Sequence, residues 1–271
     1  MKVMVIDRDR ECVEQIETLC REIDGVELVL EPIKNTALEI LRSEPYDAVL
    51  FDPAPQNNEL RAFMIGVRRG NPHYTPLTVM SHLMPKEDIL SMGANDGLTK
   101  PFDAKIFKEK VENLRRLSDL NKRLSDESED FPSREGLISK SAFNQIFISS
   151  LDRADRYGEE TYLTFASIKN IDDIRNTHGE EKAAEISENL KKYTMRIRRL
   201  SDIAGRTAQH EICLMLMRPA NSEEPKMAIK RFADSMAEYA ELISTSDVKA
   251  VIQVQMMAIP TGEITFSQEF E

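Results

Sequence analysis

The stretch DAVLFDPAP, Asp47–Pro55, decides the architecture of the first half of the chain. Its apolar run from Ala48 to Phe51 is typical of a strand that is buried on both faces, and it ends directly on the acid Asp52. Segments with a helical spacing of apolar residues separate it from further strand-like runs, which are KVMVI (2–6), VELVL (26–30), PLTVM (76–80) and DGLT (96–99). This alternation predicts an α/β fold with an open, doubly wound, five-stranded parallel sheet.

Polar residues follow these runs at the points where the strands end. In a doubly wound sheet the active crevice lies at the carboxyl ends of the strands. The residues there are Asp7, Arg8 and Asp9 after the first strand, Asp52 after the third, Ser81 after the fourth and Lys100 after the fifth. A carboxylate that accepts a phosphoryl group needs positive charge beside it, and an acid with a lysine meets that need.

Four segments, in order and spacing, resemble the landmarks of the receiver domain of bacterial response regulators; they are VIDRD (5–9), DAVLFDPAP (47–55), TVMS (78–81) and GLTKPFD (97–103). The resemblance covers the whole first half. It implies that Asp52 is the phospho-acceptor, Ser81 the switch hydroxyl and Lys100 the cation that contacts the phosphate. Asp7 belongs to the same implied site.

The sequence departs from the receiver pattern at three positions. Arg8 stands where receivers carry a second acid for Mg²⁺, Gly97 replaces the aromatic switch residue, and the usual proline is displaced to Pro55. Mg²⁺ requires carboxylate oxygens, and a guanidinium repels it, so we expect no firmly held Mg²⁺ and weak or absent phosphorylation of Asp52. Arg8 could instead pair with Asp7 or Asp52 and imitate the charge of the metal. Alternatively, the acceptor acid and the lysine form a plain buried ion pair.

Residues 103–125 have a strongly helical pattern, and DESEDFPSRE (126–135) then breaks it with acids, serine and proline. The helix carries an apolar stripe of Ile106, Val111, Leu114, Leu117, Leu120 and Leu124. Its loosely heptad spacing predicts a homodimer through this helix, with packing on its own domain as the alternative. We therefore divide the chain into residues 1–120, a helical extension and hinge at 121–133, and a second domain at 134–271.

The second half has an α+β pattern, from which we expect a mainly antiparallel sheet. A hairpin is predicted at 203–217, where two β-rich arms enclose a polar turn. The other predicted elements are a helix at 139–158, a strand at 161–168, helices at 171–179 and 181–200, a helix at 223–244 and a strand at 248–260.

The order and lengths of these elements resemble the GGDEF domain of diguanylate cyclases over nearly all of 133–260. The segments that carry the resemblance are GLISKSAF (136–143), IRNTHG (174–179) and RLSDIAGRTAQHEI (199–212). They correspond to the family patterns TGLxNRxxF, INDxYGH and RxxDxxxRxGGDEF.

The resemblance also locates the catalytic positions, and the residue types there do not suit catalysis. Joining two GTP molecules needs Mg²⁺ held by acids, and the family glycines let the backbone approach phosphate. The metal-binding positions carry Ser167, Lys169 and His210, the guanine-reading positions Arg175 and Ala184, and the signature reads Ala208, Gln209, His210, Glu211. A single remaining carboxylate cannot build a hard-cation site. We therefore expect a degenerate domain without cyclase activity.

The neighbours His210 and Glu211 could also indicate an acid–base pair or a transition-metal site. Adjacent strand residues point to opposite faces, and His178 is the one other histidine in this half. A histidine in an exposed turn is common without function, and that interpretation is favoured here.

The motif RLSD, with Arg199 and Asp202, stands where the GGDEF family has its RxxD inhibitory site for cyclic di-GMP. An arginine can grip guanine or phosphate in a bidentate manner, and an aspartate can accept the guanine N–H groups. Arg198 and Arg206 add local positive charge, and Arg153, Arg156 or Arg231 could complete the clamp. The alternative is a solvated ion pair, which would stabilise the protein by less than about 1 kcal/mol.

Composition limits the remaining function classes. The net charge of −11 over 271 residues argues against DNA binding, and no apolar run approaches the roughly 18 residues of a membrane span. Cys12, Cys20 and Cys213 lack metal spacing, and they are expected to be reduced thiols in the cytoplasm.

We therefore expect a non-catalytic bacterial signalling regulator that binds cyclic di-GMP, needs no cofactor and relays the signal to an effector protein. A nucleotide-free interaction scaffold and a low-activity cyclase are the alternatives. A polar location within the cytoplasm rests on the family resemblance alone.

Overall fold

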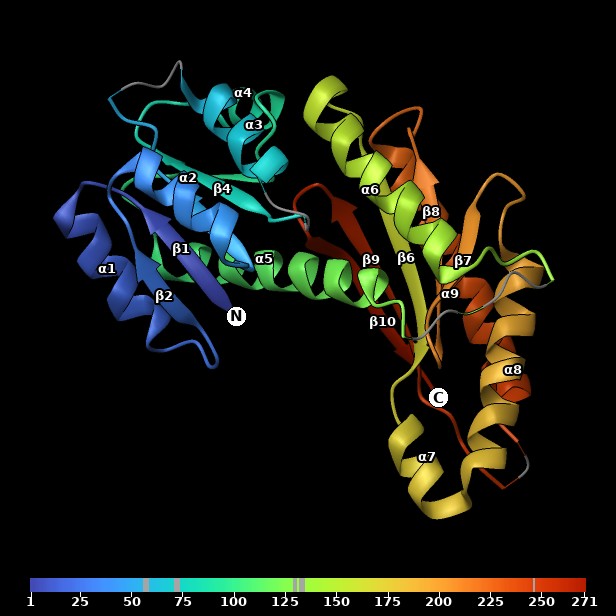
Figure 1. Ribbon diagram of the computed structural model, residues 1–271. Coiled ribbons are helices and arrows are strands. Elements are labelled where there is room, and N and C mark those ends of the chain that lie inside the picture. Colours follow the sequence, from blue (N-terminus) through green and yellow to red (C-terminus); the bar gives the residue numbers. More distant parts are fainter. Residues whose placement is uncertain (56–58, 71–73, 129–130, 132–134, 246) are drawn as a thin grey trace. The chain divides into compact units, whose positions relative to one another are not determined.

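The computed structural model spans residues 1–271 and describes all of them except 56–58, 71–73, 129–130, 132–134 and 246 (Figure 1). The chain forms two compact units, and each is considered by itself. The first comprises Met1–Lys122, Leu151–Glu159 and Pro260–Gly262, and the second comprises Arg123–Ser150, Glu160–Ile259 and Glu263–Glu271. Within the described part, no helix is long and apolar enough to cross a membrane.

The first unit contains the predicted five-stranded parallel sheet, with strand order β2-β1-β3-β4-β5. The strands are β1 (Lys2–Ile6), β2 (Glu27–Leu30), β3 (Ala48–Phe51), β4 (Leu77–Ser81) and β5 (Asp96–Thr99). This order is one of the two common doubly wound arrangements, in which ligands bind where the strand order reverses. Here that point lies between β1 and β3, where Asp7 and Asp52 follow their strands.

Helices cover both faces of this sheet (Figure 1). They are α1 (Arg10–Cys20), α2 (Lys34–Ser43), α3 (Leu60–Gly70), α4 (Lys86–Ser91) and α5 (Ala104–Ser125). Alternate residues of β1 pack into the hydrophobic clusters on the two faces of the sheet, because successive side chains of a strand point to opposite faces. Met4 packs in the cluster that includes Phe63 of α3, and Val5 packs in the cluster that includes Ile16 of α1.

Part of the apolar stripe of α5 belongs to the core of the first unit. Val111 and Leu114 are buried there together with Phe107, whereas Ile106 at the start of the stripe is 49% exposed. This portion of the helix packs on its own domain, which was the alternative to dimerisation. The homodimer through residues 103–125 stays a prediction.

The second unit has a five-stranded sheet in the order β10-β9-β6-β8-β7, and each neighbouring pair is antiparallel. The strands are β6 (Thr161–Ile168), β7 (Ile203–Ala208), β8 (Glu211–Met217), β9 (Ile252–Ile259) and β10 (Glu263–Phe270). The predicted antiparallel sheet is thus confirmed. The sequence did not predict β10, an edge strand in which Ile264, Phe266 and Phe270 lie on the more buried face and Gln268 interrupts their alternation.

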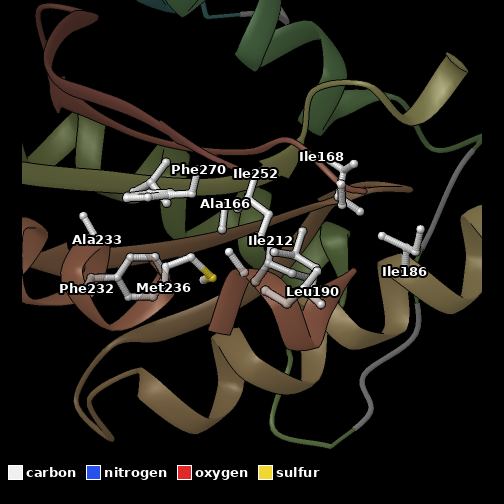
Figure 2. Packing of buried hydrophobic residues seen from close by; sticks show 14 of the residues in the cluster. Ala166, Ile168, Ile186, Leu190, Ile212, Phe232, Ala233, Met236, Ile252 and Phe270 are labelled. Carbon is white, nitrogen blue, oxygen red and sulfur yellow. The ribbon is translucent and has the colours of Figure 1, made fainter. Parts of the chain in front are cut away.

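Two long helices cover one face of this second sheet. The helices of the region are α6 (Lys140–Tyr157), α7 (Ile171–His178), α8 (Glu180–Ile197) and α9 (Glu223–Ile243). Figure 2 shows Leu190 of α8 and Met236 of α9 in the core with Ile212 and Ile252 from the strands. The prediction that the α8 helix reaches residue 200 is wrong, because it ends at Ile197 and the RLSD motif lies outside it.

Candidate functional site

Two carboxylates and one lysine meet at the carboxyl edge of the first sheet. Lys100 Nζ lies 2.5 Å from Asp7 Oδ2 and 2.5 Å from Asp52 Oδ2. The side chains of Asp7 and Lys100 are each 2% exposed, so water screens their attraction little. Burial by itself lowers the pKa of Lys100, but the hydrogen bonds to Asp52 and Asp7 outweigh burial and raise the pKa above its ordinary value. The structure thus brings these three predicted residues together as a charged cluster.

The remaining oxygens of the two carboxylates bind backbone N–H groups. Asp9 donates its N–H to Asp7 Oδ1 at 2.9 Å, and Ala54 donates its N–H to Asp52 Oδ1 at 2.8 Å. Asp9 itself is the N-cap of α1, where its carboxylate accepts the first free N–H groups of the helix. Each carboxylate is therefore held by a backbone group on one oxygen and by the lysine on the other.

Arg8 does not make the ion pairs that the sequence suggested. Its Nε donates to the carbonyl of Pro32 at 3.4 Å, and among the described contacts it has no ion pair with Asp7 or Asp52. Arg8 makes no such pair because Lys100 already forms an ion pair with Oδ2 of both acids. Arg8 instead borders a cavity.

That cavity lies at the strand ends and has a volume of about 200 Å³. Asp7, Arg8 and Asp52 line it together with Pro53, Ala54 and Pro55. An ion pair between Lys34 and Glu59 also lines it. The buried Ser81 is the last residue of β4, and its Oγ accepts the N–H groups of Leu83 and Met84, each at 3.2 Å.

The residues of this site do not fit Mg²⁺. The ion requires several oxygen ligands in near-octahedral geometry. The carboxylate oxygens of Asp7 and Asp52 are already bonded to Lys100 and to backbone N–H groups. Across the described residues, no group of three or more histidine, cysteine, aspartate or glutamate side chains could hold a metal ion. No step is therefore assigned to a metal here.

The turn of the β7–β8 hairpin forms a second polar cluster. Arg175 Nη2 lies 2.6 Å from His210 Nε2, and Ser187 Oγ hydrogen bonds to His210 Nδ1. Arg175 also pairs with Asp172 at 2.6 Å and with Glu180 at 2.7 Å. The interpretation of His210 as a residue of an exposed turn is therefore corrected, because its ring is partly buried and bound on both nitrogens.

The pKa of His210 lies below its ordinary value. Burial is the largest cause, and the positive charges of Arg175 and Arg206 add to it. A neutral ring suits the hydrogen bonds. Nε2 then accepts from Arg175, Nδ1–H donates to Ser187 Oγ, and the Ser187 hydroxyl donates to the carbonyl of Ala183 at 2.8 Å.

Glu211 lies beside this cluster with different partners. It opens β8 and pairs in register with Ser167 of β6, while Thr207 Oγ1 donates to its carboxylate at 2.6 Å. Arg123 lies 2.8 Å from the same carboxylate. Gln209 Nε2 contacts Glu180 at 3.4 Å, and Ala208 pairs with Glu211 after a β-bulge. The structure thus brings the signature positions together, but it separates the contacts of His210 from those of Glu211.

The RLSD motif forms a turn between α8 and β7. Asp202 Oδ2 accepts the backbone N–H of Arg199 at 3.1 Å, and Asp202 N–H donates to the carbonyl of Arg199 at 3.1 Å. Arg198 Nη1 donates to the carbonyl of Asp202 at 2.9 Å. Between them, Leu200 is 95% exposed. The acid and the arginine of the motif thus share one exposed turn, although the Asp202 carboxylate binds the Arg199 backbone.

The guanidinium of Arg199 is bound by a residue that the sequence reasoning missed. Arg199 Nη1 lies 3.0 Å from Glu224 Oε1, and the two side chains are 30% and 26% exposed. The N–H of Ala220 donates to Glu224 Oε2 at 2.7 Å. That bond and the hydrogen bond from Arg199 lower the pKa of Glu224. A position 25 residues away at a helix start gives no sequence signal for this contact.

Three of the other predicted arginines, Arg206, Arg153 and Arg156, bind separate partners. Arg206 Nε donates to the carbonyl of Gln209 at 3.0 Å, and its guanidinium lies 4.9 Å from the ring centre of Phe131. Arg231 is exposed on α9. Arg153 pairs with Glu159, and Arg156 pairs with Asp152 at 3.0 Å.

The chain has limited similarity to proteins of known structure. No protein-family model and no curated protein matches this chain. A receiver domain of a Francisella response regulator is 27% identical, with 42% of this chain and 94% of that one covered and a TM-score of 0.37. The receiver domain of a Pseudomonas aeruginosa sensor histidine kinase, with a magnesium ion coordinated in its active site cleft, is 20% identical over 44% of this chain and 97% of that one, with a TM-score of 0.37.

A GGDEF domain from Pseudomonas aeruginosa (TpbB or YfiN) is 19% identical over 44% of this chain and 70% of that one, with a TM-score of 0.37. These TM-scores are too low to support an argument about function. The two units are defined by their own strand order and contacts.

Proposed function

We propose that this chain is a non-catalytic signalling regulator that binds cyclic di-GMP at Arg199 and Asp202 and relays the signal to an effector protein. The observation that carries the proposal is the position of the RLSD turn. The motif lies outside α8 on an exposed turn, and residues 203–207 separate it from the signature residue Ala208. This is the offset of the inhibitory site in the family that the second half resembles.

The chemistry of the turn suits a guanine nucleotide with two phosphates. A guanidinium can bind guanine or phosphate oxygens through two parallel N–H groups, and it can stack on a base. Arg199 now binds a partly exposed carboxylate, and solvent weakens the attraction in ion pairs of this kind. A ligand that offers two contacts can therefore displace Glu224 at small cost.

The contacts at the hairpin support the non-catalytic part of the proposal. Arg175 and His210 bind each other, although their positions in the resembled family would read guanine and hold a metal. Glu211 is the acid that remains, and Thr207 and Arg123 occupy its carboxylate. Incubation with GTP and Mg²⁺ should therefore give no pppGpG and no cyclic di-GMP by chromatography, and clear product formation would overturn this part.

Calorimetric titration of cyclic di-GMP into the full chain tests the binding site. We expect a measurable affinity for the wild-type protein and a loss of about fivefold or more for Arg199→Ala, because a bidentate contact to guanine contributes about 1–3 kcal/mol. Lys226→Ala is the matched control, since it removes one positive charge from an exposed side chain of α9. Absence of heat with the wild-type protein would contradict the proposal.

A nucleotide-free scaffold is the second candidate, and one observation favours it. Arg199 already has a carboxylate partner, so the turn is satisfied without a ligand. The same titration separates the two candidates, because a scaffold gives no heat with either variant.

A further inference from the structure

A larger cavity, of about 550 Å³, opens where α1 and the end of β2 meet in the first unit. From α1 it is lined by Arg10, Val13 and Glu14, which share one face of the helix because they are three and four residues apart. Leu30 at the end of β2 and Ile33 in the link to α2 also line it. Its volume falls within the range of about 300–1,000 Å³ that is usual for small-molecule sites.

Apolar side chains form much of the wall of this cavity. Val5 is 1% exposed and pairs in register with Leu30, so both side chains stand on the face of the sheet that α1 covers. Leu30 is nevertheless 41% exposed, and Ile33 is 54% exposed. A ligand with an apolar body would remove these side chains from water, which is favourable. The wall therefore favours a ligand with an apolar tail or ring.

Two arginines bring positive charge to the same cavity. Arg8 lines it, and the Arg8 Nε donates only a long hydrogen bond to the carbonyl of Pro32, at 3.4 Å. Arg10 is the first residue of α1, and its side chain is exposed. Within the part of the chain that the structure describes, neither guanidinium forms an ion pair. Because a guanidinium binds a carboxylate through two parallel N–H groups, this pair favours an acid group on the ligand.

Two glutamates limit the negative charge that the ligand can carry. Glu14 lies one turn after Arg10 on α1, and Glu31 follows β2, where its Oε1 accepts the N–H of Ile33 at 2.8 Å. Both carboxylates line the cavity, so they would repel a second negative charge on the ligand. The charges of the lining thus favour a single acid group over a dicarboxylate or a polyphosphate.

We propose that this cavity binds a small monocarboxylate with an apolar tail or ring, such as a medium-chain fatty acid. The acid group of the ligand binds Arg8 and Arg10, and its apolar body covers Val13, Leu30 and Ile33. The site uses residues of the first unit alone, so it does not depend on cyclic di-GMP binding at the RLSD turn.

Calorimetric titration of three linear ligands into the full chain tests the chemical class. Octanoate, 1-octanol and octanedioate share one carbon chain length and differ in the number of acid groups. We expect saturable binding of octanoate with a negative heat-capacity change, which marks the burial of apolar surface. The other two ligands should bind about fivefold or more weakly, because one lacks the charged acceptor and the other adds a repelled charge. Absence of octanoate binding, or equal affinity for either of the other ligands, would overturn the proposal.

Charge variants locate the acid group. Arg8→Gln and Arg10→Gln should each weaken octanoate binding by about fivefold or more, whereas 1-octanol binding should stay unchanged. Arg21→Gln is the matched control, because it removes an exposed arginine from the other end of α1 and should bind octanoate as the wild type does. Wild-type octanoate affinity in both cavity variants would contradict the proposed site.

A cavity-filling variant locates the apolar body. Val13→Phe places a larger side chain in the cavity and should weaken the binding of octanoate and of 1-octanol together. Undiminished binding of octanoate by this variant, folded as judged by circular dichroism, would place the ligand elsewhere and overturn the proposal. If Val13→Phe does not fold, the comparison of Arg8→Gln with Arg21→Gln decides the question.

Discussion

At the scale of single residues, Glu224 is placed as an internal competitor for Arg199. Its carboxylate lies where an anionic group of a ligand would bind the guanidinium, 3.0 Å from Arg199 Nη1. The backbone N–H of Ala220 orients it, and Asn221 Oδ1 accepts the N–H of Glu224 at 3.0 Å. A ligand must break this contact before the arginine can bind it.

The substitution Glu224→Gln should therefore strengthen cyclic di-GMP binding. The gain should be up to about fivefold, because solvent weakens an ion pair between partly exposed side chains. Calorimetric titration measures it. The matched control is Glu223→Gln, which removes the neighbouring charge from an exposed pair with Lys226 and should change the affinity less. Equal affinities of wild type and Glu224→Gln would contradict the competitor role while leaving the binding site intact.

His210 makes the stability of the second unit depend on pH. Its folded-state pKa lies below the ordinary value of 6.5, mainly through burial and then through Arg175. The unfolded chain therefore binds the proton more readily than the folded chain does. The contribution of the neutral ring is present above pH 6.5, and it is lost as the pH falls through the folded-state pKa.

Denaturant unfolding at several pH values should show this dependence. The free energy of unfolding of the wild type should fall more steeply below pH 6.5 than that of His210→Gln, which keeps hydrogen-bonding groups but cannot titrate. His178→Gln is the control, because it removes an exposed histidine at the end of α7, away from the His210 contacts. Parallel pH profiles for wild type and His210→Gln would show that the ring is not a titrating element.

At the scale of elements, the end of α8 shows how local bonds override a periodic pattern. The sequence through residue 200 still has helical character, yet Arg198 is extended with φ −61° and ψ 154°. The Asp202 carboxylate accepts a hydrogen bond from the N–H of Arg199, and the Arg198 side chain donates one to the carbonyl of Asp202. These bonds offer the backbone an alternative to the next helical turn. They place the RLSD turn outside the helix.

The packing of β7 against α6 depends on a glycine. A methyl group at Gly205 would lie 2.9 Å from Phe143 Cγ, and Phe143 is fully buried. Gly205 also pairs with Cys213 of β8, so its backbone cannot move away freely. The strand approaches the helix closely because this position has no side chain.

Gly205→Ala should destabilise the second unit by about 1–3 kcal/mol, the usual cost of adding a methyl group to a well-packed core. Thermal or denaturant unfolding measures the loss. A cycle with Phe143→Leu serves as the control, because the two residues touch and the combined loss should be smaller than the sum of the single losses. Fully additive losses would mean that the cost of Gly205→Ala has another origin.

At the scale of the whole molecule, the fold followed well from the sequence, whereas the sites followed only in part. The ends of the predicted β-rich runs differ from the observed strand ends by at most four residues; TYLTFASI coincides with β6, and VKAVIQVQMMAIP begins four residues before β9. The strand β10 was missed although Ile264, Phe266 and Phe270 alternate with more exposed polar residues, because Gln268 interrupts the alternation. A strand can be predicted from the sequence when buried apolar residues alternate regularly with exposed polar ones.

For the candidate sites too, the sequence predicted one part and the tertiary structure decided the rest. The sequence by itself determined that Asp7, Asp52 and Lys100 follow parallel strands, and parallel strands end at one edge of a sheet. Only the tertiary structure decided that Lys100 serves both acids, that Arg175 binds His210 and that Glu224 binds Arg199. The physical reason is that the periodicity of apolar residues records which face is buried. The choice among competing charged partners depends on distances between residues that are far apart in the chain.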